Sequence, residues 1–200
     1  MGKTSLYDET LIRRISGKDV AAFKELVERY QTSIYSTCLS LIGDYHQAEE
    51  AAQDTFFQIY RTAGSFRGES KVSTWIYRIA VNRSLNLIRK NTRSRWVRSL
   101  SLGWRDEIKD VQIFQGSSPE EPEKQLEEKE KRRFIESALA SLPDKQRVAF
   151  VLSKYENLTS REISEILGTS VNSVDARIHR AKRSLQKRVL AVLKKNSEEP

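Results

Sequence analysis

The chain has 200 residues, 38% of them apolar, and carries a net charge of +8. This length allows one large domain or two small ones with modest cores. The excess of basic over acidic residues favours a polyanionic partner. The single cysteine, Cys38, excludes an internal disulfide and is expected to be buried. No apolar run approaches the roughly 18 residues of a membrane span or forms a signal peptide, so we expect a cytoplasmic protein without direct membrane insertion.

Glycine and proline are scarce, and runs of β-branched residues bounded by turns are missing, which predicts an all-α fold. Asp19 is the expected N-cap of a helix whose apolar residues recur at three- and four-residue steps. These residues are Phe23, Leu26, Val27, Tyr30, Ile34 and Cys38. A turn at Gly43-Asp44 leads to a second helix ended by Gly64. A third helix is expected from about Thr74 to Lys90.

Residues 93–127 lack sustained periodicity and contain Gly-Ser-Ser-Pro and Glu-Glu-Pro breakers, so they are predicted to form a flexible linker. The linker would join two small helical domains, residues 1–92 and 128–200. Trp96, Trp104 and Phe114 are unusual in a solvated tether. Docking of these aromatics on a partner and packing on the chain's own domains both remain open.

Residues 159–186, "TSREISEILGTSVNSVDARIHRAKRSLQ", predict a helix-turn-helix. Thr159 or Ser160 would cap the first helix, and Gly168 would form the tight turn. The second helix opens near Thr169-Ser170 with one apolar stripe. The inward residues are expected to be Ile163, Ile166 and Leu167 on the first helix, and Val171, Val174, Ile178, Ala181 and Leu185 on the second.

The opposite face of the second helix is small and polar at its start and basic later. It carries Asn172, Ser173, Ala176, His179, Arg180 and Arg183. From Arg177 to Lys195 there are eight basic side chains and no acidic one. This order suits a recognition helix that places its first turns in the major groove and its later cations on phosphates. A solvated basic helix on a plain hairpin is the alternative.

The N-terminal half carries two blocks of opposite charge. Between Tyr30 and Tyr60 there is no Lys or Arg, whereas between Arg61 and Arg95 nine basic residues stand against Glu69 alone. Two partners, one basic and one polyanionic, would explain both blocks. The basic block includes Trp75, Tyr77 and Asn82, which suit single-stranded nucleic acid through stacking and base-edge hydrogen bonds. Taken singly, the two aromatics are more typical of a core.

Four stretches resemble, in order, the sequence blocks of extracytoplasmic-function (ECF) sigma factors, the promoter-recognition subunits of bacterial RNA polymerase. They are "GKDVAAFKELVERYQ", "AEEAAQDTFFQIYR", "FRGESKVSTWIYRIAVN" and the stretch from Leu142 to Leu185. The resemblance covers about residues 10–92 and 128–190. It implies a sigma-2 domain that binds polymerase and melts the −10 element, and a sigma-4 domain that reads the −35 element. The linker would thread the polymerase cleft.

The resemblance also implies residue roles. The surface for core polymerase would comprise Asp44, Glu49, Glu50, Gln53, Asp54 and Phe57. The −10 surface would comprise Arg67, Ser70, Lys71, Ser73, Trp75, Arg78, Asn82 and Arg83. The −35 surface would comprise Asn172, Ser173, Asp175, Ala176, Arg177, His179, Arg180 and Arg183. Implied partners are core RNA polymerase (its β′ clamp helices and β flap), promoter DNA and an anti-sigma factor.

One position departs from the family pattern, because many members have Lys or Arg where this chain has Asp175. An aspartate repels phosphate but can accept from cytosine N4 or hold a neighbouring Arg. No enzyme activity, cofactor or metal is expected, given two histidines, one cysteine and no phosphate-binding glycine loop. A stand-alone helix-turn-helix regulator of duplex operators is the alternative function, and an RNA-binding factor is a third.

Overall fold

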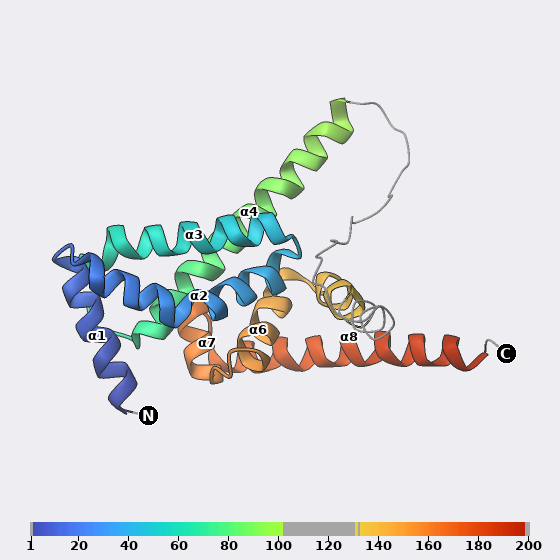
Figure 1. The fold of residues 1–200 in the computed structure, drawn as a ribbon. Helices are drawn as coiled ribbons and strands as arrows, with labels where there is room; N and C mark the ends of the chain where they lie inside the picture. Colours follow the sequence, from blue (N-terminus) through green and yellow to red (C-terminus); the bar gives the residue numbers. More distant parts are fainter. Residues whose placement is uncertain (1, 102–130, 132, 199–200) are drawn as a thin grey trace, which may run out of the picture.

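A computed structural model describes residues 2–101, 131 and 133–198 of the chain. Within these residues every regular element is a helix, which confirms the predicted all-α fold. The helices form two groups, an N-terminal domain from α1 to α4 and a C-terminal domain from residue 133 to the end of α8 (Figure 1). None of the helices in these segments is long and apolar enough to cross a bilayer.

The N-terminal domain comprises α1 (Gly2–Ser16), α2 (Val20–Ile42), α3 (Tyr45–Thr62), the short 3-10 helix η1 (Ala63–Ser65) and α4 (Val72–Ser101). Helices α2, α3 and the first part of α4 pack against one another, and α1 crosses one end of them (Figure 1). Fully buried apolar side chains from all four long helices form the core. The largest are Leu11, Ile15, Leu26, Ile34, Leu41, Ile59, Ile76, Val72 and Val81.

The predicted N-cap at Asp19 and the predicted turn at Gly43-Asp44 are confirmed, whereas α3 ends at Thr62, just before the expected Gly64. The Asp19 carboxylate accepts a hydrogen bond from the backbone N–H of Ala22 at the start of α2. Gly43 ends α2 with a φ of 76°, where a residue without a Cβ is favoured. Asp44 then caps α3 by accepting from the N–H of Gln47. These short-range interactions explain why the turn at residues 43–44 could be predicted.

Two helices differ from the prediction. Helix α1 was not expected, although its Leu11, Ile12 and Ile15 are almost completely buried. Helix α4 was expected to end near Lys90, but it continues to Ser101 and projects beyond the other helices (Figure 1). The first residues of the predicted linker are therefore helical. The remainder of the linker lies outside the described residues, as do the side chains of Trp96, Trp104 and Phe114.

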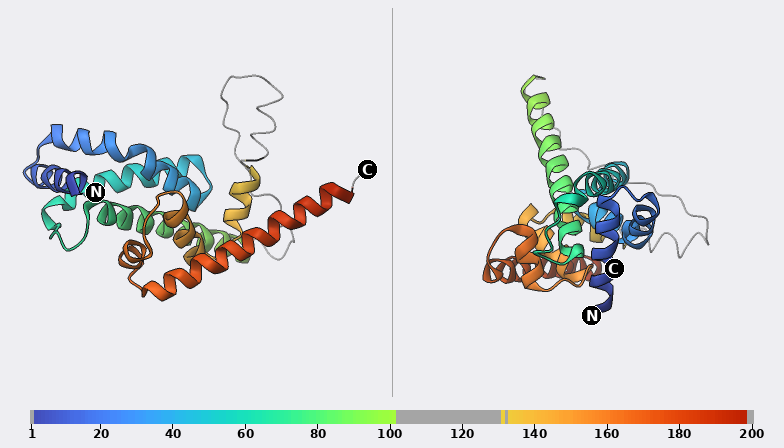
Figure 2. Two further views of the ribbon diagram at one scale, coloured as in Figure 1. Left: turned by 90° about the horizontal axis from the view of Figure 1, so that it is seen from below. Right: turned by 90° about the vertical axis from the view of Figure 1, so that its left-hand side faces the viewer.

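The C-terminal domain comprises a helical segment over residues 133–140, α6 (Asp144–Lys154), α7 (Ser160–Leu167) and α8 (Val171–Glu198). Helix α8 is long and nearly straight, and in Figure 1 it runs along the lower side of the molecule, below α2 and α6. Figure 2 shows that it extends beyond the other helices of its domain. The predicted inward residues Ile163, Ile166, Val174, Ile178 and Ala181 are buried. Leu167 and Leu185 are half-buried. The prediction for Val171 was wrong: at the first residue of α8 its side chain is 39% exposed.

The two domains lie against each other. Helix α7 packs on α4, and α6 packs on α2, so the helix-turn-helix covers one side of the N-terminal domain (Figures 1 and 2). Segments far apart in the sequence are thereby brought together.

Candidate nucleic-acid interface

The helix-turn-helix has the local geometry predicted for it. Thr159 accepts a hydrogen bond from the N–H of Glu162, and the Glu162 carboxylate accepts one from the N–H of Thr159, which forms a complete capping box on α7. Gly168 ends α7 with a φ of 58°, and its N–H donates to the carbonyl of Ser164. A side chain at this position would be strained, so glycine sets the angle between the two helices.

The predicted −35 residues lie on the outer side of α8. Asn172, Asp175, His179, Arg180 and Arg183 are exposed, whereas Ser173, Ala176 and Arg177 are half-buried. The buried Val174, Ile178 and Ala181 alternate with them and hold the opposite side against the domain. The structure therefore presents one continuous surface that changes from small and polar to basic along the helix, as a recognition helix requires.

The unusual aspartate of this helix has an intramolecular partner. The hydroxyl of Ser160, in the first turn of α7, donates a hydrogen bond of 2.5 Å to the Asp175 carboxylate. The bond links the N-terminal ends of the two helices of the motif. Asp175 therefore helps to hold the recognition helix in place.

The predicted −10 surface lies at the loop before α4 and on the first turns of that helix. Gly68 takes a positive φ of 72° in this loop. Phe66 packs against the half-buried Trp75 with the two rings tilted by 53° and their centroids 5.3 Å apart. Arg67, Lys71 and Asn82 are exposed, whereas Ser70, Ser73, Arg78 and Arg83 are half-buried. The result is a partly exposed aromatic pair next to basic and amide side chains.

Three of the cations predicted to meet DNA are engaged within the protein. Arg83 donates to the side-chain oxygen of Gln58 on α3 at 2.7 Å. Lys71 forms an ion pair with Glu162 of α7 at 2.7 Å between nitrogen and oxygen. Arg78 donates to the backbone carbonyl of Glu165, also on α7, at 3.0 Å. The helix-turn-helix therefore occupies part of the surface that the resemblance assigns to the −10 element.

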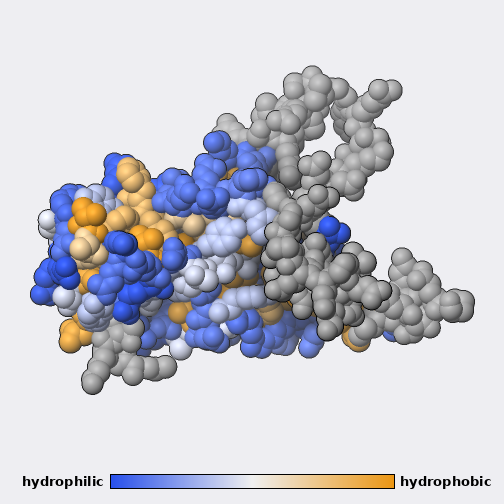
Figure 3. Space-filling model, viewed as in Figure 1, coloured by the Kyte–Doolittle hydropathy of each residue, from blue (hydrophilic) through white to orange (hydrophobic). Residues whose placement is uncertain are grey.

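The predicted polymerase surface forms an exposed stripe on α3. Its members Glu49, Glu50, Gln53, Asp54 and Phe57 are all exposed, because the opposite side of α3 is buried through Ala48, Ala51, Ala52, Thr55, Phe56 and Ile59. Asp44 is half-buried and serves as the N-cap. Phe57 is 60% exposed with the Arg61 guanidinium 5.6 Å from its ring centre. In Figure 3 apolar surface shows at the end of the domain where α2 begins and α3 ends.

Models of two protein families match the chain. The model described as sigma-70 region 2 matches residues 26–94, and the model described as sigma-70, region 4 matches residues 133–185. The ECF RNA polymerase sigma factor SigW of Bacillus subtilis is 34% identical over 179 residues, which cover 89% of this chain and 94% of that protein. The chain belongs to the ECF sigma factors. The predicted family and the predicted fold with two helical domains are confirmed.

Other ECF sigma factors match over nearly their whole length. The ECF RNA polymerase sigma-E factor of Escherichia coli K12 is 29% identical, over 95% of this chain and 98% of that one. Among solved structures, CnrH in complex with the cytosolic domain of CnrY has a TM-score of 0.68 at 21% identity, covering 92% of this chain and 98% of that one. The sigma factor RpoE bound to the anti-sigma factor NepR from Bartonella quintana has a TM-score of 0.63 at 22% identity, covering 84% and 96%. These likenesses support the fold of this sigma factor.

Sequence reasoning missed one polar residue of this sigma factor that joins its domains. Glu156 lies between α6 and α7, next to Asn157, which takes a positive φ of 52°. Its carboxylate accepts hydrogen bonds from the hydroxyls of Thr37 on α2 and Tyr77 on α4. Both donors are buried. The pKa of Tyr77 is raised, chiefly because the phenol is buried and also because it donates this hydrogen bond, so the phenol stays protonated. No periodic pattern signals a contact between residues so far apart in sequence.

The ion pair between Lys71 and Glu162 predicts a pH dependence of stability. Burial alone would raise the pKa of Glu162, but hydrogen bonds from Lys71 and Thr159 outweigh it and hold that pKa below its usual range. A carboxylate whose pKa is lower in the folded than in the unfolded state stabilises the fold at pH values above its pKa in the unfolded state. This contribution disappears as the pH falls through the pKa that the carboxylate has in the folded state. Glu162→Gln keeps a capping side chain but removes the charge.

We therefore expect Glu162→Gln to lower the free energy of unfolding at pH 7 by up to about 1 kcal/mol, the range of exposed ion pairs. The difference from the native chain should shrink as the pH falls below the usual glutamate range. Urea unfolding at several pH values measures this difference in the free energy of unfolding. Glu165→Gln is the matched control, because that side chain pairs with Arg161 at 3.8 Å on the exposed surface of the same helix. A pH-independent difference would contradict the expectation.

Proposed function

We propose that this sigma factor binds core RNA polymerase, directs it to specific promoters and promotes opening of the DNA. The observation that carries the proposal is the separation of three surfaces over two domains. An acidic stripe lies on α3, an aromatic and basic loop precedes α4, and a basic recognition helix forms α8. All three surfaces are required only in a protein that binds a basic protein partner and contacts nucleic acid at two separate places.

Polymerase capture is assigned to the stripe on α3. Exposed carboxylates at Glu49, Glu50 and Asp54 are suited to the basic β′ clamp helices expected from the family, since complementary charge steers association. The exposed ring of Phe57 lies one turn beyond Gln53 and would supply apolar contact area. Asp44 then contributes mainly by holding the first turn of α3 in place.

Promoter reading is assigned to two elements. The exposed side of α8 would enter the major groove of the −35 element, with Asn172 and Ser173 toward the bases and Arg180 and Arg183 toward bases or phosphates. At the −10 element, unstacked bases would be held by the loop at residues 66–71 and by Asn82. Each base stacked on an aromatic ring contributes roughly 1–3 kcal/mol, so captured bases can offset the cost of opening.

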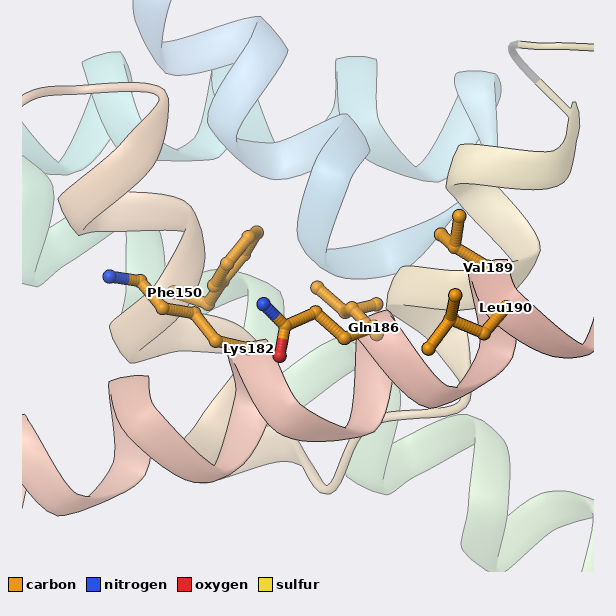
Figure 4. A pocket seen from close by; sticks show the side chains of 6 residues that line it. Phe150, Lys182, Gln186, Val189 and Leu190 are labelled. Atoms are coloured by element: carbon orange, nitrogen blue, oxygen red, sulfur yellow. The ribbon is translucent and has the colours of Figure 1, made fainter.

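A shallow apolar groove between α6 and α8 is a further contact site in this proposal. It has a volume of about 490 Å³ and is lined by Phe150, Lys182, Leu185, Gln186, Val189 and Leu190 (Figure 4). Leu190 is 57% exposed and Val189 41%. An amphipathic helix can place apolar side chains in such a groove. We assign it to the β flap of core polymerase, the remaining partner expected from the family.

The proposal includes three further points. The factor works in the cytoplasm, where core polymerase is found. It is not an enzyme, because base capture supplies the free energy for opening and no nucleotide is hydrolysed. An anti-sigma factor is an expected partner, consistent with the structural likeness to a sigma factor solved with one.

Transcription with purified core polymerase tests the proposal. The chain is mixed with sigma-free core polymerase and a library of promoter fragments, and the transcripts are sequenced. We expect transcripts that begin at a fixed distance from a shared pair of sequence elements. A chain that binds duplex DNA but neither binds core polymerase nor yields transcripts would be a stand-alone regulator. A chain that prefers RNA in a salt-controlled competition would be an RNA-binding factor.

A further inference from the structure

Asp175 is a carboxylate on a helix that is otherwise basic. The sequence of α8 contains eight lysines and arginines, and Asp175 is its only acidic residue before the last one, Glu198. The side chain of Asp175 is exposed. A negative charge here lowers the attraction to phosphates on which non-specific DNA binding depends. Contact with the DNA backbone therefore does not account for this carboxylate.

Asp175 lies in the part of α8 that the proposed function places in the major groove. It follows the exposed Asn172 by three residues and precedes the exposed His179 by four, so the three share one side of the helix. At 100° per residue, Asp175 is turned by about 40° from His179 around the helix axis. It occupies the edge of the exposed surface that borders α7, on which its partner Ser160 lies.

The carboxylate of Asp175 is held in one orientation by the helix-turn-helix itself. Ser160, the first residue of α7, is half-buried and donates its hydroxyl to Asp175 Oδ1 at 2.5 Å. A carboxylate can accept about four hydrogen bonds, so this one leaves capacity for a partner outside the protein. A side chain that is already fixed loses less conformational entropy on binding than a free one. The hydrogen bond from Ser160 thus prepares Asp175 for a directional contact.

The chemistry of the major groove leaves one base that fits a fixed acceptor. A carboxylate only accepts hydrogen bonds, and the amino groups of cytosine and adenine are the only donors on the base edges there. Guanine presents two acceptors, and thymine presents one acceptor and a methyl group. Adenine places the acceptor N7 beside its amino group, where it repels the second carboxylate oxygen. Cytosine has a C–H group beside its amino group, so a carboxylate can hold it without a repulsive neighbour.

We propose that Asp175 is a specificity-determining residue, which accepts a hydrogen bond from the N4 amino group of a cytosine in the −35 element while Ser160 positions it. The inference rests on the proposed function, because it takes α8 to read the −35 duplex. It predicts a G·C pair in that element whose cytosine cannot be replaced without loss of affinity. Any other base there leaves the carboxylate unpaired or opposite an acceptor, which penalises the wrong sequence.

Binding selection with the assembled complex tests this role. The chain and core polymerase are mixed with promoter fragments whose −35 element is randomised, and the bound fragments are sequenced. We expect the native chain to select cytosine at one position by about tenfold or more, the range of a good base contact. Asp175→Ala should lose this preference at that position alone. Asp175→Asn should shift it towards adenine, which an asparagine amide recognises.

Two further variants separate positioning from charge. Ser160→Ala leaves the carboxylate but removes the hydrogen bond that orients it, so the preference for cytosine should weaken at the same position and at no other. Glu165→Gln is the matched control, because it removes one negative charge from α7, where the Glu165 carboxylate pairs with Arg161 at 3.8 Å. It should leave every base preference unchanged. Circular dichroism checks that each variant retains its helices.

A modified duplex tests the same contact from the side of the DNA. The selected cytosine is replaced by a 2-pyrimidinone nucleotide, which carries a hydrogen in place of the amino group. The complex with the native chain should bind this duplex about tenfold more weakly than the unmodified one. The complex with Asp175→Ala should bind both duplexes equally, because the variant has no acceptor for the amino group to lose.

Two results would overturn this role of Asp175 and leave the proposed function intact. If Asp175→Ala binds every fragment more tightly by the same factor, the carboxylate only repels phosphates. If Asp175→Ala selects the same −35 element as the native chain, the carboxylate only joins the two helices. A native complex that selects no −35 element and yields no transcripts would refute the proposed function itself, and the base contact with it.

Discussion

Reversing the charge of the exposed stripe on α3, with Glu49→Lys and Asp54→Lys together, is expected to prevent capture by core polymerase. Both carboxylates are exposed, and α3 is anchored by its opposite, buried side. The change should therefore leave stability within about 0.5 kcal/mol. At the interface, each attractive contact becomes a repulsion with a basic partner, which costs several kcal/mol when the charges are close. We expect at least about a hundredfold loss of affinity, or roughly 2.7 kcal/mol.

Titration of labelled core polymerase with the chain measures this effect. The matched control is Glu9→Lys with Glu28→Lys, which makes the same charge change on α1 and α2 of the same domain. The Glu28 carboxylate is 60% exposed and pairs with Lys24 at 3.8 Å, so its loss should matter little. Equal weakening by both double variants would show that net charge, and not the stripe on α3, governs polymerase binding.

Removing the guanidinium of Arg180 is expected to weaken promoter recognition while polymerase binding is unchanged. Arg180 is exposed on the basic part of α8, next to the exposed His179. An arginine that contacts a guanine contributes roughly 1–3 kcal/mol of discrimination against other bases. Arg180→Ala should therefore reduce binding of the −35 duplex by about tenfold or more. The affinity of the chain for core polymerase should stay the same, because Arg180 belongs neither to the stripe on α3 nor to the residues that line the groove between α6 and α8.

Lys194→Ala provides the control for Arg180→Ala. Lys194 is exposed on the same helix, about 21 Å further along its axis at 1.5 Å per residue, beyond the turns that face the groove. Binding of a randomised −35 duplex pool, followed by sequencing, separates two roles for Arg180. Loss of preference at one base pair indicates a base contact, whereas uniform weakening with a lower salt dependence indicates a phosphate contact. Unchanged binding to all duplexes would remove Arg180 from the proposed interface.

Local features of this sigma factor could be predicted because they depend on a few neighbouring residues. The capping aspartates at positions 19 and 44, the turn at Gly168 and the apolar stripe of α8 all rest on interactions within about four residues. The buried state of Cys38 followed from the apolar residues around it. Its pKa is raised to about 11 by burial, so the thiol is unreactive at neutral pH.

Features that depend on distant residues could not be predicted. Asp8 on α1 is almost fully buried, pairs with Arg29 at 3.1 Å and accepts from the Tyr30 hydroxyl at 2.6 Å. No residue within one helical turn of Asp8 indicates these partners, which lie on α2. The partner of Asp175 was also hidden, since Ser160 is brought to it by the turn between the two helices.

The amino-acid sequence alone determined α2, α3, the first turns of α4 and the two helices of the helix-turn-helix, most of the residues that these helices bury, and the membership of the chain in the ECF sigma factors. These depend on the order of apolar, polar and capping residues along the chain. Only the tertiary structure decided that the helix-turn-helix lies on α4 and that Glu156, Glu162 and the Glu165 carbonyl engage side chains of the other domain. Such contacts join residues about 80 to 120 positions apart, a separation at which local sequence patterns carry no information about which groups meet.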